Sequence, residues 1–374
     1  MRRLLAALLV SWATFAGAEP VQERLDALRA SHGFPGATVA WADAEGLEAR
    51  ATGWADPDRG LPMTKDTRML AASIGKSFTA AAALSLQAEE VLDLDAPLAR
   101  WLGDRPWFPR LPNHRTLTLR HLLTHSGGLP DHIHLPAFAE LFAATRNDEA
   151  PPEPEALIAL VLEAEPLFAP GEGWAYSDTG YLLAALAIEE AVGRPWTDVV
   201  AARFLAPLDL TATAPSDRRR LPRLAVGIAD SAGGLDLPAR TLDADGALVW
   251  HPGLEGAGGG FVSTASDLAR WGRALWSGRA MQTAYLDEML NAVPTGAPGV
   301  RYGLGVSIRE DGPFGEVRGH GGWIPGYVAA LRYHPAHDTA IAVMVNTDVW
   351  MLGDDGALPV IEAVLTRAIL ADGG

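Results

Sequence analysis

The chain has 374 residues, of which 48% are hydrophobic and 20% charged, and its formal net charge is -16 at pH 7. This length and apolar content support a full-sized hydrophobic core and exclude an intrinsically disordered chain. The sequence contains no cysteine, which excludes disulfides, a thiolate nucleophile and cysteine-ligated metals. Its acidic balance, with no long run of basic residues, argues against nucleic acid as a partner.

The first 18 residues have the features of a secretory signal peptide. Two arginines precede an apolar run over residues 4–16, and small residues at positions 16–18 form a cleavage site. The apolar run is shorter than the roughly 17 residues that a membrane-spanning helix needs. We therefore expect cleavage after Ala18, no stable membrane anchor, and a mature protein of residues 19–374 in the periplasm or outside the cell.

Apolar periodicity places strands near both ends of the mature chain and helices between them. A helix is expected over residues 21–31, and an alanine-rich, buried helix over residues 72–89. Further helices are expected over residues 119–123, 153–165, 179–192, 197–204, 265–276 and 358–370. Strands are expected over residues 36–41, 47–53, 302–309, 316–319, 327–333 and 339–345.

This order of elements predicts an α/β fold of the α+β type. The two ends of the chain would build one antiparallel sheet flanked by helices, and the middle would form a second, mainly helical lobe. We expect a single domain over residues 19–374, with a sheet lobe over about 19–75 and 295–374 and a helical lobe over about 76–220. Residues 221–294 are not assigned to either lobe. A cleft between the lobes is the expected place for a site.

Lysine is scarce in this chain: only Lys65 and Lys76 occur, although arginine is abundant. Arginine is a poor proton acceptor, so lysine is the residue to expect where a proton must move. Lys76 follows Ser73 by three residues, which places both on one face if a helix begins near Ser73. The free NH groups of a helix N-terminus would also favour a developing alkoxide. The alternative is a helix cap at Ser73 and a solvated Lys76.

Two later segments strengthen the interpretation of Ser73 as a nucleophile. Tyr176-Ser177-Asp178 precedes an expected helix, and His320-Gly321-Gly322 lies where an expected strand ends or bulges. A phenol can share the proton of a serine if an ammonium group favours the phenolate, which requires Tyr176 beside Lys76. Each segment alone is typical of a core or surface position. Together with Ser73 and Lys76, the two segments form a set of candidate catalytic residues.

The set resembles the serine β-lactamase and penicillin-binding-protein group, in particular the branch of class C β-lactamases, DD-carboxypeptidases and related esterases. The resemblance covers nearly the whole mature chain. Its motifs lie at residues 36–37, 73–76, 121–130, 176–181, 259–264, 267–270, 319–322 and 325–326. It implies a β-lactamase-like catalytic domain over residues 19–374.

The resemblance also implies a two-step acyl transfer without a metal or an organic cofactor. Ser73 is implied as the nucleophile, with Lys76 and Tyr176 as the coupled general base and acid. The backbone NH groups of Ser73 and Trp323 are implied as the oxyanion hole. The residues implied to border the substrate pocket are Asp178, His320, Gly321 and Gly322.

Two positions depart from the pattern of the family. The second motif of the family, which is Tyr176-Ser177-Asp178 in this chain, commonly ends in asparagine. Asp178, when ionised, can only accept hydrogen bonds, whereas an asparagine can also donate them. An ionised Asp178 would also favour the charged form of Lys76, which would make Tyr176 the better base. The third motif, which is His320-Gly321-Gly322 in this chain, commonly has threonine or serine at its middle position, where this chain has Gly321. The missing hydroxyl removes a donor for a substrate carboxylate, which favours a neutral ester or amide over a β-lactam.

Two rival sites compete with Ser73. His121 and His125 have the spacing of helical metal ligands, and Asp131, His132 and His134 would complete a zinc site. The glutamate of a metalloprotease motif is absent from this helix, so the interpretation without metal is preferred. Ser231 lies in a segment that approximates a nucleophile elbow but lacks its first glycine, and a loop serine is the better interpretation.

We therefore expect an exported serine hydrolase that acts through a Ser73 acyl-enzyme on a small-molecule ester, amide or peptide. A DD-carboxypeptidase or a β-lactamase is the alternative within the enzyme class. A binder that captures penicillin or peptidoglycan peptides and releases them slowly is the alternative of another class, and deacylation would discriminate the two. The sequence leaves the natural substrate and the oligomeric state undetermined.

Overall fold

The computed structural model describes residues 19–230, 235–310, 312–353 and 355–371. The expected signal peptide lies outside these residues. In the described ranges, no helix combines the length and the apolar character that crossing a membrane would require.

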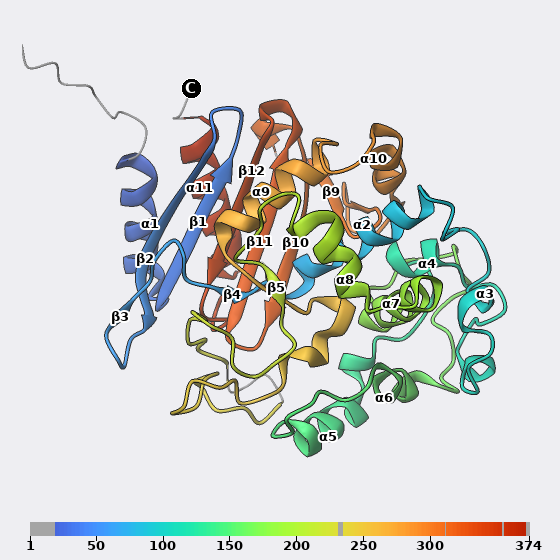
Figure 1. Ribbon diagram of the computed structural model, residues 1–374. Helices are drawn as coiled ribbons and strands as arrows, with labels where there is room; N and C mark the ends of the chain where they lie inside the picture. The colour runs from blue at the N-terminus through green and yellow to red at the C-terminus, as the bar shows by residue number, and fades with distance from the viewer. Residues whose placement is uncertain (1–18, 231–234, 311, 354, 372–374) are drawn as a thin grey trace, which may run out of the picture.

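An antiparallel sheet forms the centre of one lobe, and segments from both ends of the chain build it (Figure 1). In the described residues its strand order is β3-β2-β1-β12-β11-β10-β9-β8-β7. The two ends meet where β1 pairs with β12, with Ala37 opposite Val345. The strands are β1 Gly36–Ala42, β2 Leu47–Asp56, β3 Leu61–Pro62, β7 Val293–Pro294, β8 Arg301–Tyr302, β9 Ser307–Glu310, β10 Glu316–Ile324, β11 Tyr327–His334 and β12 Thr339–Val345.

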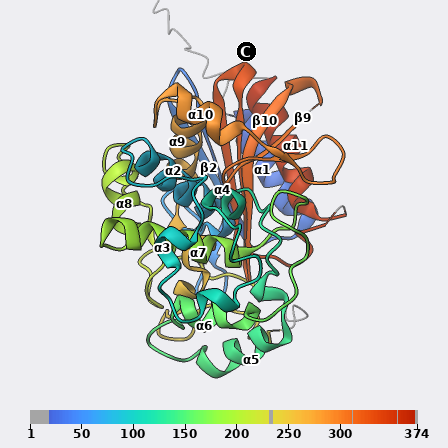
Figure 2. The same cartoon turned by 90° about the vertical axis from the view of Figure 1, so that its right-hand side faces the viewer.

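Helices cover both faces of this sheet. α1 (Glu19–His32) and α11 (Ala357–Leu370) pack together on one face, and α9 (Ala265–Trp276) packs on the other (Figure 2). The alternation of side chains along β1 explains the two layers, because Ala37 and Val39 join the core beneath α1 and α11 whereas Ala40 and Ala42 face the opposite core. The sheet is therefore buried on both sides.

The second lobe is mainly helical and lies beside β10. Its helices are α2 Lys76–Gln87, α3 Ala99–Leu102, α4 Leu119–Leu123, α5 Pro136–Thr145, α6 Pro154–Ile158, α7 Asp178–Val192 and α8 Trp196–Val200. α2 lies between α7, α8 and α10 (Thr283–Leu290), and its run of buried alanines lets these neighbours approach closely. A small sheet of β4 (Met69–Leu70), β6 (Phe261–Ser263) and β5 (Ala214–Pro215) borders the start of α2.

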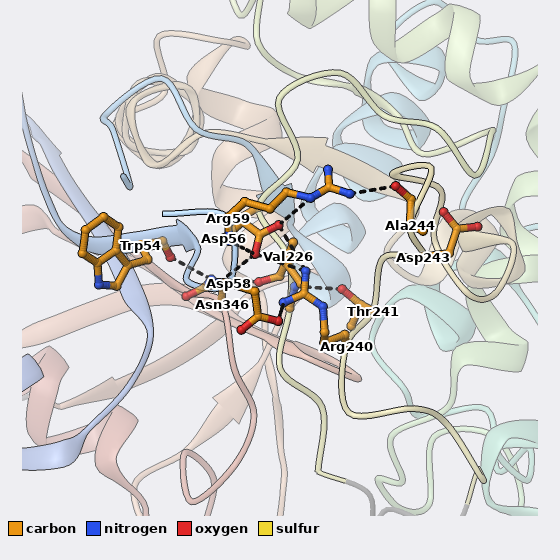
Figure 3. Close-up of polar contacts among 12 residues, drawn as sticks. Trp54, Asp56, Asp58, Arg59, Val226, Arg240, Thr241, Asp243, Ala244 and Asn346 are labelled. Atoms are coloured by element: carbon orange, nitrogen blue, oxygen red, sulfur yellow. Dashed lines mark hydrogen bonds and ion pairs between the residues drawn. The ribbon is translucent and has the colours of Figure 1, made fainter. Parts of the chain in front are cut away.

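Polar contacts, more than regular elements, anchor residues 221–230 and 235–256 (Figure 3). Asn346 at the end of β12 donates from Nδ2 to the carbonyl oxygens of Trp54 (3.1 Å) and Val226 (2.8 Å). Arg240 forms an ion pair of 3.1 Å with the buried carboxylate of Asp56. Such long-range contacts leave no periodic signal in a sequence, which is why this segment could not be assigned from its residues alone.

The structure corrects four of the expected elements. The helix expected over residues 153–165 is shorter, because α6 ends at Ile158 and a 3-10 turn, Ala159–Val161, follows it. The expected helix over residues 72–89 is a 3-10 turn, Ala72–Gly75, followed by α2 from Lys76, because Ala72 has a positive φ of 48° that an α-helix cannot accommodate. The strand expected to end at Gly319 continues to Ile324, since its glycines remain paired with β11. The strand expected over residues 302–309 is split into β8 and β9, which form an antiparallel pair.

Candidate active site

A cleft of about 650 Å³ lies between the sheet lobe and the helical lobe. Ser73 lies in it together with Tyr176 and Asp178 from the helical lobe and His320 from β10. Much of the remaining wall is apolar and includes Phe138, Phe142, Leu235, Trp250, Leu254 and Ile324. The cleft therefore combines a small group of polar side chains with an extensive apolar surface, as ligand sites commonly do.

Ser73 and Lys76 meet at the start of α2. The Lys76 Nζ donates to Ser73 Oγ (3.0 Å) and to the carbonyl oxygen of Gly258 (2.5 Å), and it forms an ion pair with Asp178. Lys76 is completely buried, whereas the other lysine of the chain, Lys65, is exposed. Lys76 is therefore not the solvated surface charge of the alternative interpretation.

Glycines allow the backbone to approach Ser73 and Lys76. A Cβ atom at Gly75 would lie 2.7 Å from the Gly259 carbonyl oxygen, and one at Gly258 would lie 2.9 Å from Asp178 Oδ1. Real Cβ atoms essentially never approach other atoms within 3.0 Å. Gly258 and Gly259 consequently bring the loop before β6 against the first turn of α2, where the Gly258 carbonyl meets Lys76.

Tyr176 lies over the same amine. The Lys76 Nζ is 4.8 Å from the centroid of the Tyr176 ring, and the centroid of the His125 ring lies 4.1 Å from the same point, with the two rings tilted by 35°. Burial and the nearby Asp178 raise the pKa of Tyr176 well above its usual value, although a hydrogen bond with Ser73 acts in the opposite direction. The phenol therefore keeps its proton at neutral pH.

Three carboxyl groups surround the single buried ammonium group. Besides Asp178, these are Asp131, which is 7% exposed, and the half-buried Glu255. Burial, followed by repulsion from Asp178, raises the pKa of Asp131 to about 7 and that of Glu255 to about 8. Asp131 and Glu255 thus hold protons at a pH where ordinary carboxyl groups have lost them.

His320 is neutral and fixed in orientation. Its Nδ1 donates to the Gly321 carbonyl oxygen (2.5 Å), and its Nε2 lies 2.7 Å from the Tyr302 hydroxyl. Burial and the charge of Lys76 lower its pKa to about 3. Because Nδ1 carries the ring proton, Nε2 accepts from Tyr302. His320 therefore contributes no charge to the cleft at neutral pH.

The next residues of β10 form one wall of the cleft. The backbone of β10 packs against the turn that holds Ser73, and Gly321, Gly322 and Trp323 all line the cleft. A Cβ atom at Gly322 would collide with the Ala71 carbonyl oxygen, whereas one at Gly321 would meet only the Ala329 carbonyl oxygen, at 3.9 Å. Gly322 thus permits the approach to Ser73, while Gly321 leaves open space.

The histidines that would compose a zinc site are used separately. His121 Nδ1 lies 3.1 Å from Thr118 Oγ1 in a helix cap, His125 accepts from the Ser177 NH, and His132 bonds to Thr179. In the parts of the chain that the structure covers, no three histidine or acidic side chains are grouped as metal ligands. The other rival residue, Ser231, lies outside the described residues.

Sequence reasoning missed Glu255, and assigned Asp131 only to the zinc alternative. Both positions lie outside the three motifs, and a carboxylate brought near Lys76 by packing has no local spacing that reveals it. Tyr302, which contacts His320, was missed for the same reason, and His125, which lies against the Tyr176 ring, was assigned to the motif at residues 121–130 and to the zinc alternative. The Gly258-Gly259-Gly260 run was the available signal, because consecutive glycines indicate close backbone approach.

Comparisons with known proteins extend these observations. The chain matches the family model described as Beta-lactamase over residues 21–365. Penicillin-binding protein 4* of Bacillus subtilis is 27% identical over 339 residues, which cover 88% of this chain and 71% of the relative. Esterase EstB of Burkholderia gladioli is 31% identical over 312 residues, which cover 78% of this chain and 73% of the esterase. A solved D-stereospecific amidohydrolase from Streptomyces sp. has a TM-score of 0.77 and 30% identity, covering 92% of this chain and 97% of that chain.

The raised pKa of Asp131 predicts a specific effect of pH on stability. Above about pH 4 this carboxyl group ionises in the unfolded chain but stays protonated in the folded protein until about pH 7, so it lowers stability as pH rises. In Asp131→Asn that loss is absent. The free energy of unfolding of the variant relative to wild type should rise by up to a few kcal/mol between pH 4 and 7. Denaturant titrations across this range measure the difference, and a constant difference would contradict the assignment.

Proposed function

Since the chain belongs to the β-lactamase family and is a serine hydrolase that acts on esters or amides, we propose that its reaction proceeds through an acyl-enzyme on Ser73. The observation that supports this is the contact of 3.0 Å between Lys76 Nζ and Ser73 Oγ, in a serine that faces the cleft. A serine hydroxyl needs such an adjacent base to become a nucleophile.

In the first step, Ser73 Oγ attacks the substrate carbonyl carbon and its proton passes to Lys76, which acts as a neutral amine after one of its own protons has passed to the Asp178 carboxylate that it contacts. The Tyr176 phenol then donates a proton to the leaving alcohol or amine as the carbon–oxygen or carbon–nitrogen bond breaks. The raised pKa of Tyr176 supports this division, because a phenol that keeps its proton serves as an acid and not as a base. This assignment reverses the preference for Tyr176 as the base that the sequence suggested.

In the second step, Lys76 passes the proton that it took from Ser73 on to Tyr176, a water molecule attacks the acyl-enzyme, and a proton of that water passes to Ser73 Oγ as the acid product leaves. Both steps place negative charge on the former carbonyl oxygen. The backbone NH groups of Ser73 and Trp323 are proposed to hold that charge, because β10 packs against the turn that carries Ser73. A preorganised donor of this kind contributes about 3–4 kcal/mol at the transition state.

We further propose that the protein is exported. The support comes from the composition of residues 1–18, with arginines before a short apolar run and small residues at its end. The exported enzyme would therefore meet its substrate outside the cytoplasm.

A penicillin-binding carboxypeptidase, or a binder that acylates and releases slowly, is the second candidate. The identity to penicillin-binding protein 4* favours it. A binder and a hydrolase differ in the rate of deacylation, because a binder stays acylated whereas a hydrolase quickly releases its acyl group. An intact-mass time course with benzylpenicillin, with Ser73→Ala as the control, separates them: a lasting adduct on Ser73 supports the binder, and no adduct supports the ester or amide hydrolase.

The pairing of Ser73 and Lys76 predicts that they act as one unit. Ser73→Ala and Lys76→Ala should each lower kcat for p-nitrophenyl acetate at least about a thousandfold, and the double variant should be scarcely worse. Steady-state rates of the four proteins measure this. Lys65→Ala is the matched control, because the exposed Lys65 should leave kcat unchanged. Retained turnover in Ser73→Ala would disprove the acyl-enzyme mechanism.

If Tyr176 acts as an acid, the loss of kcat/KM in Tyr176→Phe should depend on the leaving group of the substrate. A p-nitrophenolate ion leaves without accepting a proton, whereas an amine must be protonated. Tyr176→Phe should therefore lower kcat/KM for an anilide at least about a hundredfold, and lower it much less for the p-nitrophenyl ester of the same acyl group. Equal losses for the two substrates would show that Tyr176 acts on the Ser73 proton instead.

The space at Gly321 predicts a shift in specificity. Gly321→Thr would place a hydroxyl in the cleft without a steric clash, since the nearest atom to the new Cβ is 3.9 Å away. A new donor for a carboxylate should raise the rate of acylation by benzylpenicillin relative to p-nitrophenyl acetate by about tenfold. An unchanged ratio of the two acylation rates would mean that the missing hydroxyl does not determine specificity.

A further inference from the structure

The cleft continues around one edge of β10 onto the face of the sheet that carries α11. Among the described strands, β9 pairs with β10 only as far as Gly319, so the residues of β10 that follow leave this edge open. Trp323 pairs with Val328 of β11, which belongs to the core beneath α11. Because paired residues point to the same face and side chains alternate along a strand, Trp323 and Gly321 both face α11.

An exposed apolar patch surrounds the open space at Gly321. Trp323 lines the cleft there together with Leu352, from the loop before α11, and Leu358, from the first turn of that helix. Trp323 and Leu352 are 40% and 47% exposed, and Trp350 in the same loop is 87% exposed. Single exposed apolar side chains are common, whereas a contiguous patch beside a cleft marks a binding surface. We refer to Gly321, Trp323, Leu352 and Leu358 as the α11-side subsite.

Hydrogen bonds fix the shape of the α11-side subsite before any ligand arrives. The Trp323 indole Nε1 donates to Asp348 Oδ2 (3.0 Å), and the other oxygen of Asp348 accepts from the Asp230 NH (2.8 Å). The buried Met351 anchors the loop, and its carbonyl oxygen accepts from the Leu358 NH (3.1 Å). The flat face of the indole is therefore held in one orientation, and a preformed site loses little entropy when it binds a ligand.

The charged groups beside the α11-side subsite are already paired. Arg332 lines the cleft on this face, but it forms an ion pair of 2.7 Å with Glu362 and donates from Nη1 to the Leu331 carbonyl oxygen (3.2 Å). The Asp348 carboxylate is occupied by the indole of Trp323. The subsite therefore offers apolar surface without an uncompensated charge, which favours an apolar group over an ion.

A second apolar wall lies on the other side of Ser73. Phe138 and Phe142 of α5, with Leu254, line the cleft in the helical lobe, whereas α11 covers the opposite face of the sheet (Figures 1 and 2). The turn that carries Ser73 packs on the face of β10 that points away from α11, where a Cβ atom at Gly322 would collide with the backbone just before this turn. A substrate carbonyl at Ser73 therefore lies between the two apolar regions.

We propose that the α11-side subsite binds a flat apolar group of the substrate, stacked on Trp323, while the wall of Phe138, Phe142 and Leu254 binds a second apolar group. The substrates are thus esters or amides that carry a bulky apolar group both on the acyl part and on the alcohol or amine part. This inference rests on the proposed function of Ser73. An aromatic ring is the group that fits best, because a flat ring can stack on the fixed indole.

The test adds a ring to one side of the substrate at a time. Ethyl butanoate has small groups on both sides, ethyl hydrocinnamate adds a ring to the acyl part, benzyl butanoate adds one to the alcohol part, and benzyl hydrocinnamate has both. We would measure kcat/KM at pH 7 from the released acid by liquid chromatography. In wild type each ring should raise kcat/KM at least about tenfold, the effect of one well-packed aromatic contact. A ring that gives no gain on either side would overturn the inference.

Variants assign each gain to one apolar region. Trp323→Ala should remove the gain from one of the two rings and keep the gain from the other, and Leu352→Ser should lower the same gain as Trp323→Ala. Leu254→Ala should lower the gain from the opposite ring. Each gain is a ratio within one variant, so a displaced Trp323 NH, which would slow all four esters alike, does not change it. Loss of both gains or of neither in Trp323→Ala would contradict the proposal.

The matched control is Trp54→Ala. Trp54 is 40% exposed, as Trp323 is, but it does not line the cleft. This variant should keep both gains, and loss of either gain in it would show that the effect of Trp323→Ala is not specific to the subsite and overturn the assignment. The wild-type gains need no variant, so misfolding of Trp323→Ala would not obscure the result.

The outcome also separates this inference from the function on which it rests. Hydrolysis that persists in Ser73→Ala would overturn the acyl-enzyme mechanism itself. Hydrolysis that depends on Ser73 but gains nothing from a ring on one of the two sides would leave that mechanism intact and overturn only the role of the two apolar regions.

Discussion

The burial of a single charged amine shapes this protein. Lys76 is completely enclosed, and its Nζ meets Ser73, Asp178 and the Gly258 carbonyl oxygen. Removing an ammonium group from water is costly unless such partners surround it. Ser73 belongs to the same turn as Lys76, whereas Asp178 and Gly258 come from distant parts of the chain, so α7 and the glycine loop must both be in place before the amine is satisfied. The site is thus a product of the complete fold.

The general architecture could be predicted from the sequence because it follows from local patterns. Strands at both ends with helices between them lead to a sheet built from both termini, and β1 pairs with β12 as this requires. The spacing of Ser73 and Lys76 is also a local signal, although the turn that joins them is not the expected start of an α-helix. Tertiary contacts hold Ala72 at a positive φ, which alanine does not prefer. This backbone conformation therefore could not be predicted from the residue type.

The parts that could not be predicted depend on packing between distant segments. Glu255 reaches the cleft because Gly256, with a φ of 46°, and the glycines after it let a loop fold against Ala72. Asp131 comes near Lys76 through the turn before α5, not through a motif. The continuation of β10 past Gly319 was missed because glycine has little strand propensity, whereas the register with β11 holds the strand together.

The glycines around Ser73 differ in whether they leave room for a side chain. Any side chain at Gly75, Gly258 or Gly259 would collide with atoms that position the reacting groups. Gly321, on the facing strand, has free space in front of it and touches none of them. Variation during evolution, or in the laboratory, is therefore channelled to Gly321 and not to its neighbour Gly322, and substrate preference can change there while the chemistry stays the same. Such a division lets one scaffold give rise to enzymes with different substrates.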